Sequence, residues 1–362
     1  VIDSSNNGKP YFVGDLSAEN NYLNTRSDLH ISKLNKGIFD LSDLAFQTRM
    51  DSSLNEAKLH LIKLEEEHEN LSSNFINLET GNLEYNHKRN ILSYFNQGRE
   101  NGKEVGALNM DFMDNPGIGN IALLSSKHFK EFIFEFANTQ YKKVKADETY
   151  GQLEKYQKRY ELINSLVDVP KIQDILKTNL LSNAINTIKT IEINPLYDTF
   201  MQENTNERQL NLIKRTYQKN IPLTRGAYAP EIIGVTTGGD EVKLSDLKGK
   251  YVYIFVWATW CGPCKTEMPA YEHMVDQYGS DNIVFLGISV DKNKKNWQES
   301  FIYNKYPGMQ ILVAGDWDSP MIKNYKLQSV PQFIFIDPNG KVVSLNAPAP
   351  TKGGGNYVRA HS

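Results

Sequence analysis

Residues 251–269 constrain the fold of this chain more strongly than any other stretch. Their sequence is YVYIFVWATWCGPCKTEMP. The first seven residues, Tyr251–Trp257, are all β-branched or aromatic, which is typical of a strand buried on both faces of a mostly parallel sheet. An alternation of polar and apolar residues at helical spacing follows Cys261 and Cys264. The stretch therefore predicts a buried strand that leads into a helix beginning at a cysteine pair.

A cysteine pair at the start of a helix favours redox chemistry. The helix dipole and the free backbone N–H groups stabilise a thiolate on the first cysteine, and the thiolate is the reactive form. Two cysteines separated by two residues can close a small disulfide ring and reopen it. We therefore expect Cys261 to be the nucleophile and Cys264, one turn deeper, to be the resolving thiol.

Two other interpretations of the pair fit the sequence less well. A structural zinc site needs about four ligands, and the chain has only two cysteines, with His273 as the one nearby histidine. A purely structural disulfide between such close residues removes little entropy from the unfolded chain and stabilises weakly. We therefore expect no metal and no cofactor other than the redox-active cysteine pair.

The motif resembles that of a known family. Trp260, Cys261, Gly262, Pro263 and Cys264 match the active-site motif of thioredoxin-like proteins. The longer match through Lys265, Glu267 and Pro269 resembles the TlpA/ResA branch, the extracytoplasmic thiol-disulfide oxidoreductases of bacteria. The resemblance covers about the last third of the chain and implies an α/β domain with a central mixed sheet flanked by helices.

The same resemblance implies a surface that binds substrate. In this fold the proline that opens a later strand is cis and faces the cysteines, and Pro331 occupies that position. The Val330 backbone next to it would then be free to pair with an extended substrate segment. Trp260 and Pro263 are expected to form the apolar contact surface around Cys261.

A proton acceptor for the resolving thiol is also implied. Thioredoxins proper carry a buried aspartate in the central strand, but the corresponding residue here is Phe255. In the ResA-like branch a glutamate three residues after the second cysteine takes this role, and Glu267 has that spacing. The alternative is that Glu267 is only a first-turn glutamate favoured by the helix dipole.

The length of 362 residues predicts about two domains. Residues 1–222 are predicted to form a helical domain after an irregular first segment of about 24 residues. Apolar residues recur there at spacings of three and four, with a capping break at Ser72 and an aromatic helix around Phe129 and Phe136. Residues 223–350 are predicted to be the thioredoxin-like domain, and a fragment from Leu223 is expected to act alone. Residues 351–362 are expected to form a polar, glycine-rich tail in place of the family's last helix.

Three classes of function are compatible with this organisation. The favoured one is a thiol-disulfide oxidoreductase. The alternative is a binding or scaffold protein whose helical domain recruits a partner to a thioredoxin-like module. A peroxidase is disfavoured because the related chemistry uses a threonine three residues before the reactive cysteine, where this chain has Ala258. Residues 1–222 carry no pattern of nucleophile and base, metal ligands or phosphate loop.

Partners and location follow mainly from the resemblance. The formal net charge of -3 gives no reason to expect nucleic acid, and no apolar run is long enough to span a bilayer. The chain begins with Val1, so we expect a mature form in the periplasm or cell envelope, lipid-anchored through a missing N-terminal signal. The resemblance implies reduction of protein disulfides, with apocytochrome c among the family's substrates, and a membrane protein as electron donor. The helical domain is expected to serve as a substrate wall, a spacer or a homodimer interface.

Overall fold

The computed structural model describes residues 2–3, 11–12, 18–23, 40–68, 71–106, 108–146, 149–279 and 282–362. It divides into two compact units, Val1–Leu181 and Ser182–Ser362. The division falls inside helix α6, Pro170–Ile188, and so lies earlier than the predicted boundary at residue 222. Most of the predicted irregular first segment lies outside the described residues. None of the helices in these ranges is both long enough and apolar enough to cross a membrane.

The first unit is helical, as predicted. Its longest helices are α2 and α3, separated by the predicted break, where the Ser72 hydroxyl accepts a hydrogen bond from the Phe75 backbone N–H at 3.0 Å. The aromatic segment forms helix α4, in which Phe129 and Phe132 are fully buried. The elements are β1 Ile2–Asp3, β2 Tyr11–Phe12, α2 Asp43–Glu67, α3 Ser73–Glu100, η2 Asp111–Met113, η3 Ile121–Ser125, α4 Lys127–Ala146, α5 Gln152–Leu166 and the first part of α6.

The second unit contains a seven-stranded mixed sheet in the order β4-β3-β7-β6-β5-β8-β9. The end of α6, a short 3-10 turn and two helices precede it, within residues predicted to belong to the helical domain. Further helices follow its strands, as predicted for the thioredoxin-like domain. The elements are η4 Ile191–Ile193, α7 Asn194–Glu203, α8 Glu207–Asn220, β3 Ile233–Val235, β4 Glu241–Lys243, η5 Leu244–Leu247, β5 Tyr251–Trp257, α9 Gly262–Tyr278, β6 Ile283–Ser289, α10 Lys294–Tyr303, β7 Met309–Val313, η6 Asp316–Asp318, α11 Pro320–Tyr325, β8 Gln332–Ile336, β9 Val342–Ser344, η7 Pro350–Lys352 and α12 Gly354–His361.

The predicted buried strand is β5, an interior strand of this sheet between β6 and β8. It pairs in parallel with β6 and antiparallel with β8. Every residue after Tyr251 in the strand is buried, because neighbouring strands and helices cover both of its faces. Val256 pairs with Gln332, so the end of β5 and the start of β8 lie at the same edge of the sheet. That edge carries the segment with Cys261 and the segment with Pro331.

Helices α7 and α8 are bound to the opposite edge of the sheet. The rings of Tyr197 and Tyr217 lie 4.9 and 5.6 Å from the ring of Tyr228, which immediately precedes the sheet. Burial raises the pKa of Tyr217 to about 12, so its hydroxyl keeps its proton and donates to Asn194 Oδ1 at 2.6 Å. The Asn194 side chain in turn donates to the Gly226 carbonyl at 2.9 Å. These contacts join the helices to the lead-in of the sheet.

An ion pair also joins helix α7 to the sheet. Asp198 on α7 accepts a hydrogen bond from the Tyr228 hydroxyl and lies 3.1 Å from the Lys341 ammonium group. Lys341 follows the tight turn between β8 and β9, at the end of β8 that is remote from Pro331. Helices α7 and α8 therefore belong to the compact unit of the sheet and leave the cysteine edge uncovered.

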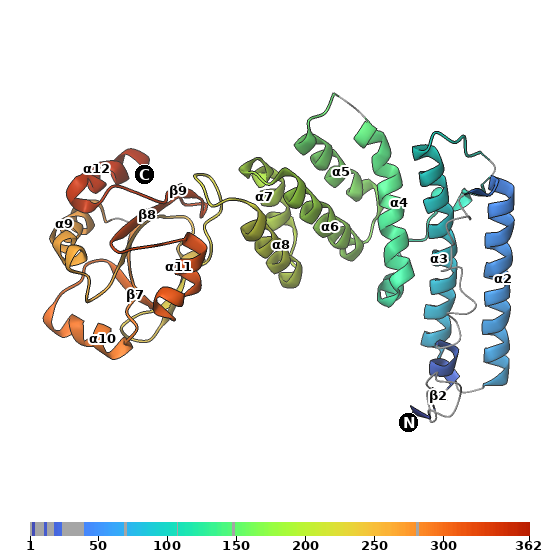
Figure 1. The fold of residues 1–362 in the computed structure, drawn as a ribbon, viewed down its shortest axis with the longest axis horizontal. Coiled ribbons are helices and arrows are strands. Elements are labelled where there is room, and N and C mark those ends of the chain that lie inside the picture. Colours follow the sequence, from blue (N-terminus) through green and yellow to red (C-terminus); the bar gives the residue numbers. More distant parts are fainter. Residues whose placement is uncertain are drawn as a thin grey trace. The chain divides into compact units, whose positions relative to one another are not determined.

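The expectation of a polar, glycine-rich tail after residue 350 is wrong. Residues 354–361 form helix α12, which packs beside α9 with Val358 fully buried (Figure 1). The glycines allow close packing at this position. A Cβ on Gly354 would lie 2.9 Å from the Pro348 carbonyl oxygen, and one on Gly355 would lie 2.5 Å from the Tyr278 ring. The glycines that suggested a tail from composition alone therefore serve to let the segment pack closely against its neighbours.

Candidate active site

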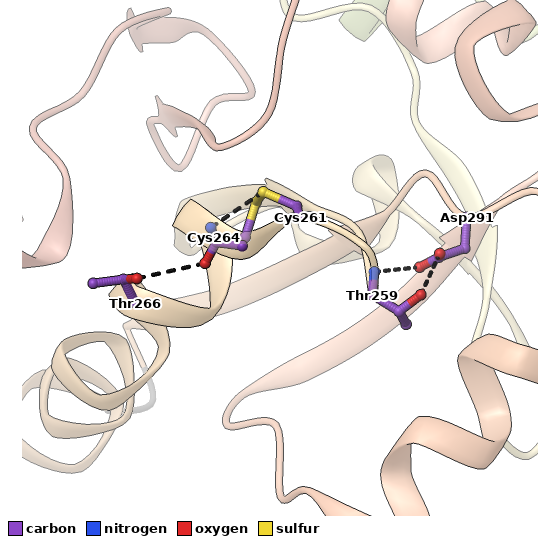
Figure 2. The surroundings of a disulfide bond; sticks show 6 residues. Thr259, Cys261, Cys264, Thr266 and Asp291 are labelled. Carbon is purple, nitrogen blue, oxygen red and sulfur yellow. Dashed lines mark hydrogen bonds between the residues drawn. A yellow bond between two sulfur atoms is a disulfide. The ribbon is translucent and has the colours of Figure 1, made fainter.

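The cysteine pair stands at the start of α9, as predicted. Cys261 and Cys264 form a disulfide with a Cα–Cα distance of 5.3 Å (Figure 2). Cys261 is the N-cap residue, and its sulfur accepts a hydrogen bond from the Cys264 backbone N–H at 3.1 Å. A donor in this position also suits a thiolate once the disulfide is reduced.

The two cysteines differ slightly in their exposure to solvent. Cys261 retains 4% of its surface and Cys264 retains none, whereas Trp260 beside them is 59% exposed. Pro263 is also exposed. An incoming disulfide therefore reaches Cys261 first, over an apolar rim formed by Trp260 and Pro263.

Hydrogen bonds anchor the turn that carries Cys261 to a residue just after the neighbouring strand β6. The Cys261 N–H donates to the Ala258 carbonyl at 3.0 Å and closes the turn. The Thr259 N–H and hydroxyl donate to the carboxylate of Asp291 at 2.9 and 2.6 Å (Figure 2). Asp291 follows the end of β6 and is 5% exposed. Asp291 was not among the predicted site residues, because its contact with Thr259 depends on β6 lying next to β5.

Pro331 and Val330 lie at the same edge of the sheet. The Val330–Pro331 peptide bond is cis, and β8 begins at the next residue. Because Gln332 pairs with Val256, Pro331 lies where β5 gives way to the cysteine turn. The predicted contact residues Trp260, Pro263, Val330 and Pro331 thus gather at one edge of the sheet.

Glu267 contacts the C-terminal segment. One carboxylate oxygen accepts a hydrogen bond from the Thr351 N–H at 3.0 Å, and the other accepts one from the Thr351 hydroxyl at 2.7 Å. Burial, and to a lesser extent the Glu267 carboxylate, raise the pKa of Tyr253, whose hydroxyl donates to the Pro348 carbonyl. Glu267 therefore ties α9 to η7, and its proposed part in proton transfer stays a prediction.

Comparison with known proteins decides the family. Residues 226–345 match the AhpC/TSA family. Thiol-disulfide oxidoreductase ResA from Bacillus subtilis (strain 168) is 31% identical over 126 residues, which cover 34% of this chain and 67% of that relative. The chain belongs to the thioredoxin-like thiol-disulfide oxidoreductases. A second ResA, from Bacillus anthracis, is 32% identical over 121 residues, which cover 33% of this chain and 66% of the relative.

Solved structures match the same region. A crystal structure of a putative thiol-disulfide oxidoreductase from Bacteroides vulgatus is 32% identical, with 38% of this chain and 96% of that chain covered and a TM-score of 0.36. A solution structure of a putative thiol-disulfide oxidoreductase from the same species is 38% identical, with 33% and 78% covered and a TM-score of 0.31. The family match at residues 226–345 leaves the helical first unit outside it.

This oxidoreductase has no acid at the centre of β5. Phe255 is fully buried there, 4.9 Å from the Phe333 ring and 5.1 Å from the Tyr271 ring. Aromatic packing therefore fills this position in the core of the sheet. Within the described ranges, no three His, Cys, Asp or Glu side chains come close enough together to hold a metal ion.

The order of reactivity of the two cysteines can be measured directly. In the reduced protein we expect Cys261 to be alkylated at least about tenfold faster than Cys264 near neutral pH, because it is better exposed and its thiolate lies at a helix N-terminus. Brief treatment with limiting iodoacetamide, followed by peptide mass spectrometry, reports both rates. Cys261→Ser is the control, in which only slow labelling should remain. Preferential labelling of Cys264 in the native protein would reverse the assignment.

Proposed function

We propose that this chain reduces protein disulfides in the bacterial cell envelope. The observation that carries the proposal is the position of Cys261, which caps α9 with the Cys264 N–H on its sulfur and an exposed Trp260 beside it. The thiol-disulfide oxidoreductase activity itself follows from the family. The direction of electron flow and the compartment are the proposed parts.

The reaction consists of two exchanges at sulfur. The Cys261 thiolate attacks one sulfur of the substrate disulfide, forms a mixed disulfide with it and releases the other substrate sulfur as a thiolate. Cys264 then loses its proton and attacks Cys261. This second step closes the Cys261–Cys264 disulfide and releases the second substrate thiolate. The substrate gains two electrons, and each of its released thiolates takes up a proton.

Two features of the site support this sequence of steps. The edge formed by Val330 and the cis Pro331 offers backbone groups next to the cysteines, to which an extended substrate segment can bind irrespective of its sequence. Glu267, three residues after Cys264 on α9, is proposed to take the proton from the resolving thiol. Each turnover leaves a disulfide, so a separate donor has to return two electrons to the pair.

The proposed partners follow from the envelope location. Folded or unfolded proteins with disulfides are the substrates, and apocytochrome c is one candidate. A membrane protein is proposed to supply the electrons. The helical first unit is proposed to recruit a partner or to form a homodimer. Extracytoplasmic location is supported by the likeness to the ResA proteins.

Trapping tests the proposed function. Cys264→Ser retains the nucleophile but removes the resolving thiol, so we expect it to lose turnover with insulin and to accumulate mixed disulfides through Cys261. In native envelope extracts the trapped partners should be exported proteins. The matched control Cys261→Ser should trap none. Recovery of cytosolic proteins alone would contradict the proposed compartment, and normal turnover of Cys264→Ser would contradict the two-step exchange.

A further inference from the structure

Asp291 is a buried carboxylate that the exchange steps above do not use. It is 5% exposed, and each of its three side-chain contacts is to a donor. Oδ2 accepts from the Thr259 N–H at 2.9 Å and from the Ser289 hydroxyl at 2.7 Å, while Oδ1 accepts from the Thr259 hydroxyl at 2.6 Å. An ionised carboxylate is an acceptor at both oxygens, so this set of donors suits the charged form.

The contacts place Asp291 directly behind the catalytic turn. Thr259 is the second residue of the turn that ends at Cys261, and the hydrogen bonds from its N–H and its hydroxyl fix its backbone and side chain (Figure 2). The next residue is the exposed Trp260. A shift of Thr259 would therefore move both the sulfur that attacks and the ring beside it.

We propose that Asp291 is a positioning residue for thiol–disulfide exchange: its carboxylate fixes the turn that presents Cys261, and its buried negative charge disfavours the Cys261 thiolate and so keeps the cysteine pair reducing. The effect of the charge on the reducing power of the pair rests on the proposed function as a reductant. A pair whose reduced form is less stable gives up its electrons more readily, just as stabilisation of the reduced form makes a pair oxidising.

The separation is short enough for the charge to act. The carboxylate is 2.9 Å from the Thr259 nitrogen, and two residues of chain span at most about 7 Å from there to Cys261, so the carboxylate lies within about 10 Å of the Cys261 backbone. This is comparable to the screening length of physiological salt, and a buried charge is screened less than an exposed one.

Other charged groups lie near this site and differ in exposure. Lys292, Lys294 and Glu241 line the same surface hollow as Asp291, and all three are exposed. Glu241 is paired with Lys243 at 3.1 Å. Lys265 and Glu267 follow the cysteines on α9, with Lys265 exposed and Glu267 bound to Thr351. Solvent screens the exposed groups, so the buried carboxylate has the largest effect on Cys261.

Removal of the charge tests this part of the proposal in the full chain. Asp291→Asn keeps the size of the side chain and one acceptor oxygen. We expect the pH midpoint of Cys261 alkylation to fall. The equilibrium in which the disulfide and two glutathione thiols form the dithiol and glutathione disulfide should shift toward the dithiol by about tenfold, the size expected for a unit charge at this separation. A tenfold shift corresponds to about 30 mV.

Controls separate charge from structure. Glu241→Gln removes an exposed carboxylate from the same hollow and should change neither quantity. Asp291→Glu keeps the charge and should leave the glutathione equilibrium near that of the native protein. Asp291→Ser removes the charge with a smaller side chain and replaces Asp291→Asn if that variant does not fold. An unchanged or higher alkylation midpoint in a folded, uncharged variant would overturn the electrostatic part.

Thr259→Val tests the positioning part, because it removes one donor but keeps the carboxylate. It should slow the reduction of a protein disulfide several-fold without lowering the alkylation midpoint. An unchanged rate would show that Asp291 does not act through the turn. The alkylation and glutathione measurements need no protein substrate. They therefore remain informative if the chain proves not to reduce envelope proteins, and that failure would appear separately as absence of trapping.

Discussion

A fragment that begins at Leu223 is expected to be less stable than one that begins at Ser182 by about 3 kcal/mol, the order expected for lost aromatic burial and two or three polar contacts. The reason is the contact of α7 and α8 with the lead-in of the sheet. A start at Leu223 removes Tyr197 and Tyr217 from the ring of Tyr228 and leaves Lys341 without Asp198. The fragment that begins at Ser182 keeps all of these contacts and should retain disulfide reductase activity.

Urea denaturation of the two fragments, followed by near-ultraviolet circular dichroism, measures the difference. A matched test in the full chain is Tyr228→Ala, which removes the ring at the centre of the contact. Leu212 on α8, which is 51% exposed, provides the control, because Leu212→Ala should leave stability nearly unchanged. Equal midpoints for the two fragments would show that α7 and α8 do not stabilise the sheet, and the functional boundary would then return to residue 222.

The boundary illustrates what a local pattern can and cannot predict. Residues 206–219 have a clear amphipathic pattern, and α8 forms with Asn206 as its N-cap. A hydrophobic face shows that a helix packs against something, but it does not identify the partner. The contact depends on Tyr228 and on Lys341, which lies 143 residues from Asp198 in sequence. A contact between residues so far apart in sequence cannot be predicted from local periodicity.

The active-site residues likewise fall into those that a local pattern predicts and those that it does not. Cys261, Cys264 and Pro331 were predictable because their chemistry depends on residue type and on spacing to a neighbouring strand. Asp291 was missed because its role depends on two parallel strands being neighbours, a fact of topology. Likewise, Gly354 and Gly355 at the start of α12 indicated a polar, glycine-rich tail, because their close contacts with Pro348 and Tyr278 are visible only in the fold.

The second large effect is expected at Glu267, where two roles compete. If the carboxylate takes the proton from Cys264, Glu267→Gln should slow product release from the Cys261 mixed disulfide by about 10²–10⁴-fold, the usual contribution of a positioned base. The pH dependence that the base imposes on this step should also disappear. Alkylation of Cys261 should change little, because that thiolate relies on the helix N-terminus.

The alternative role is structural, and Thr351 makes it testable. Both oxygens of Glu267 accept hydrogen bonds from Thr351, so Glu267→Gln also loosens α9 from η7, with a loss of about 1–3 kcal/mol in unfolding free energy. Thr351→Val removes the hydroxyl donor but leaves the carboxylate in place. It should lower stability by a similar amount while mixed-disulfide resolution stays near the native rate. If both variants slow resolution equally, the tie to Thr351 accounts for the effect and Glu267 is not the base. If only Glu267→Gln slows it, the same carboxylate both anchors the C-terminal segment and accepts the proton.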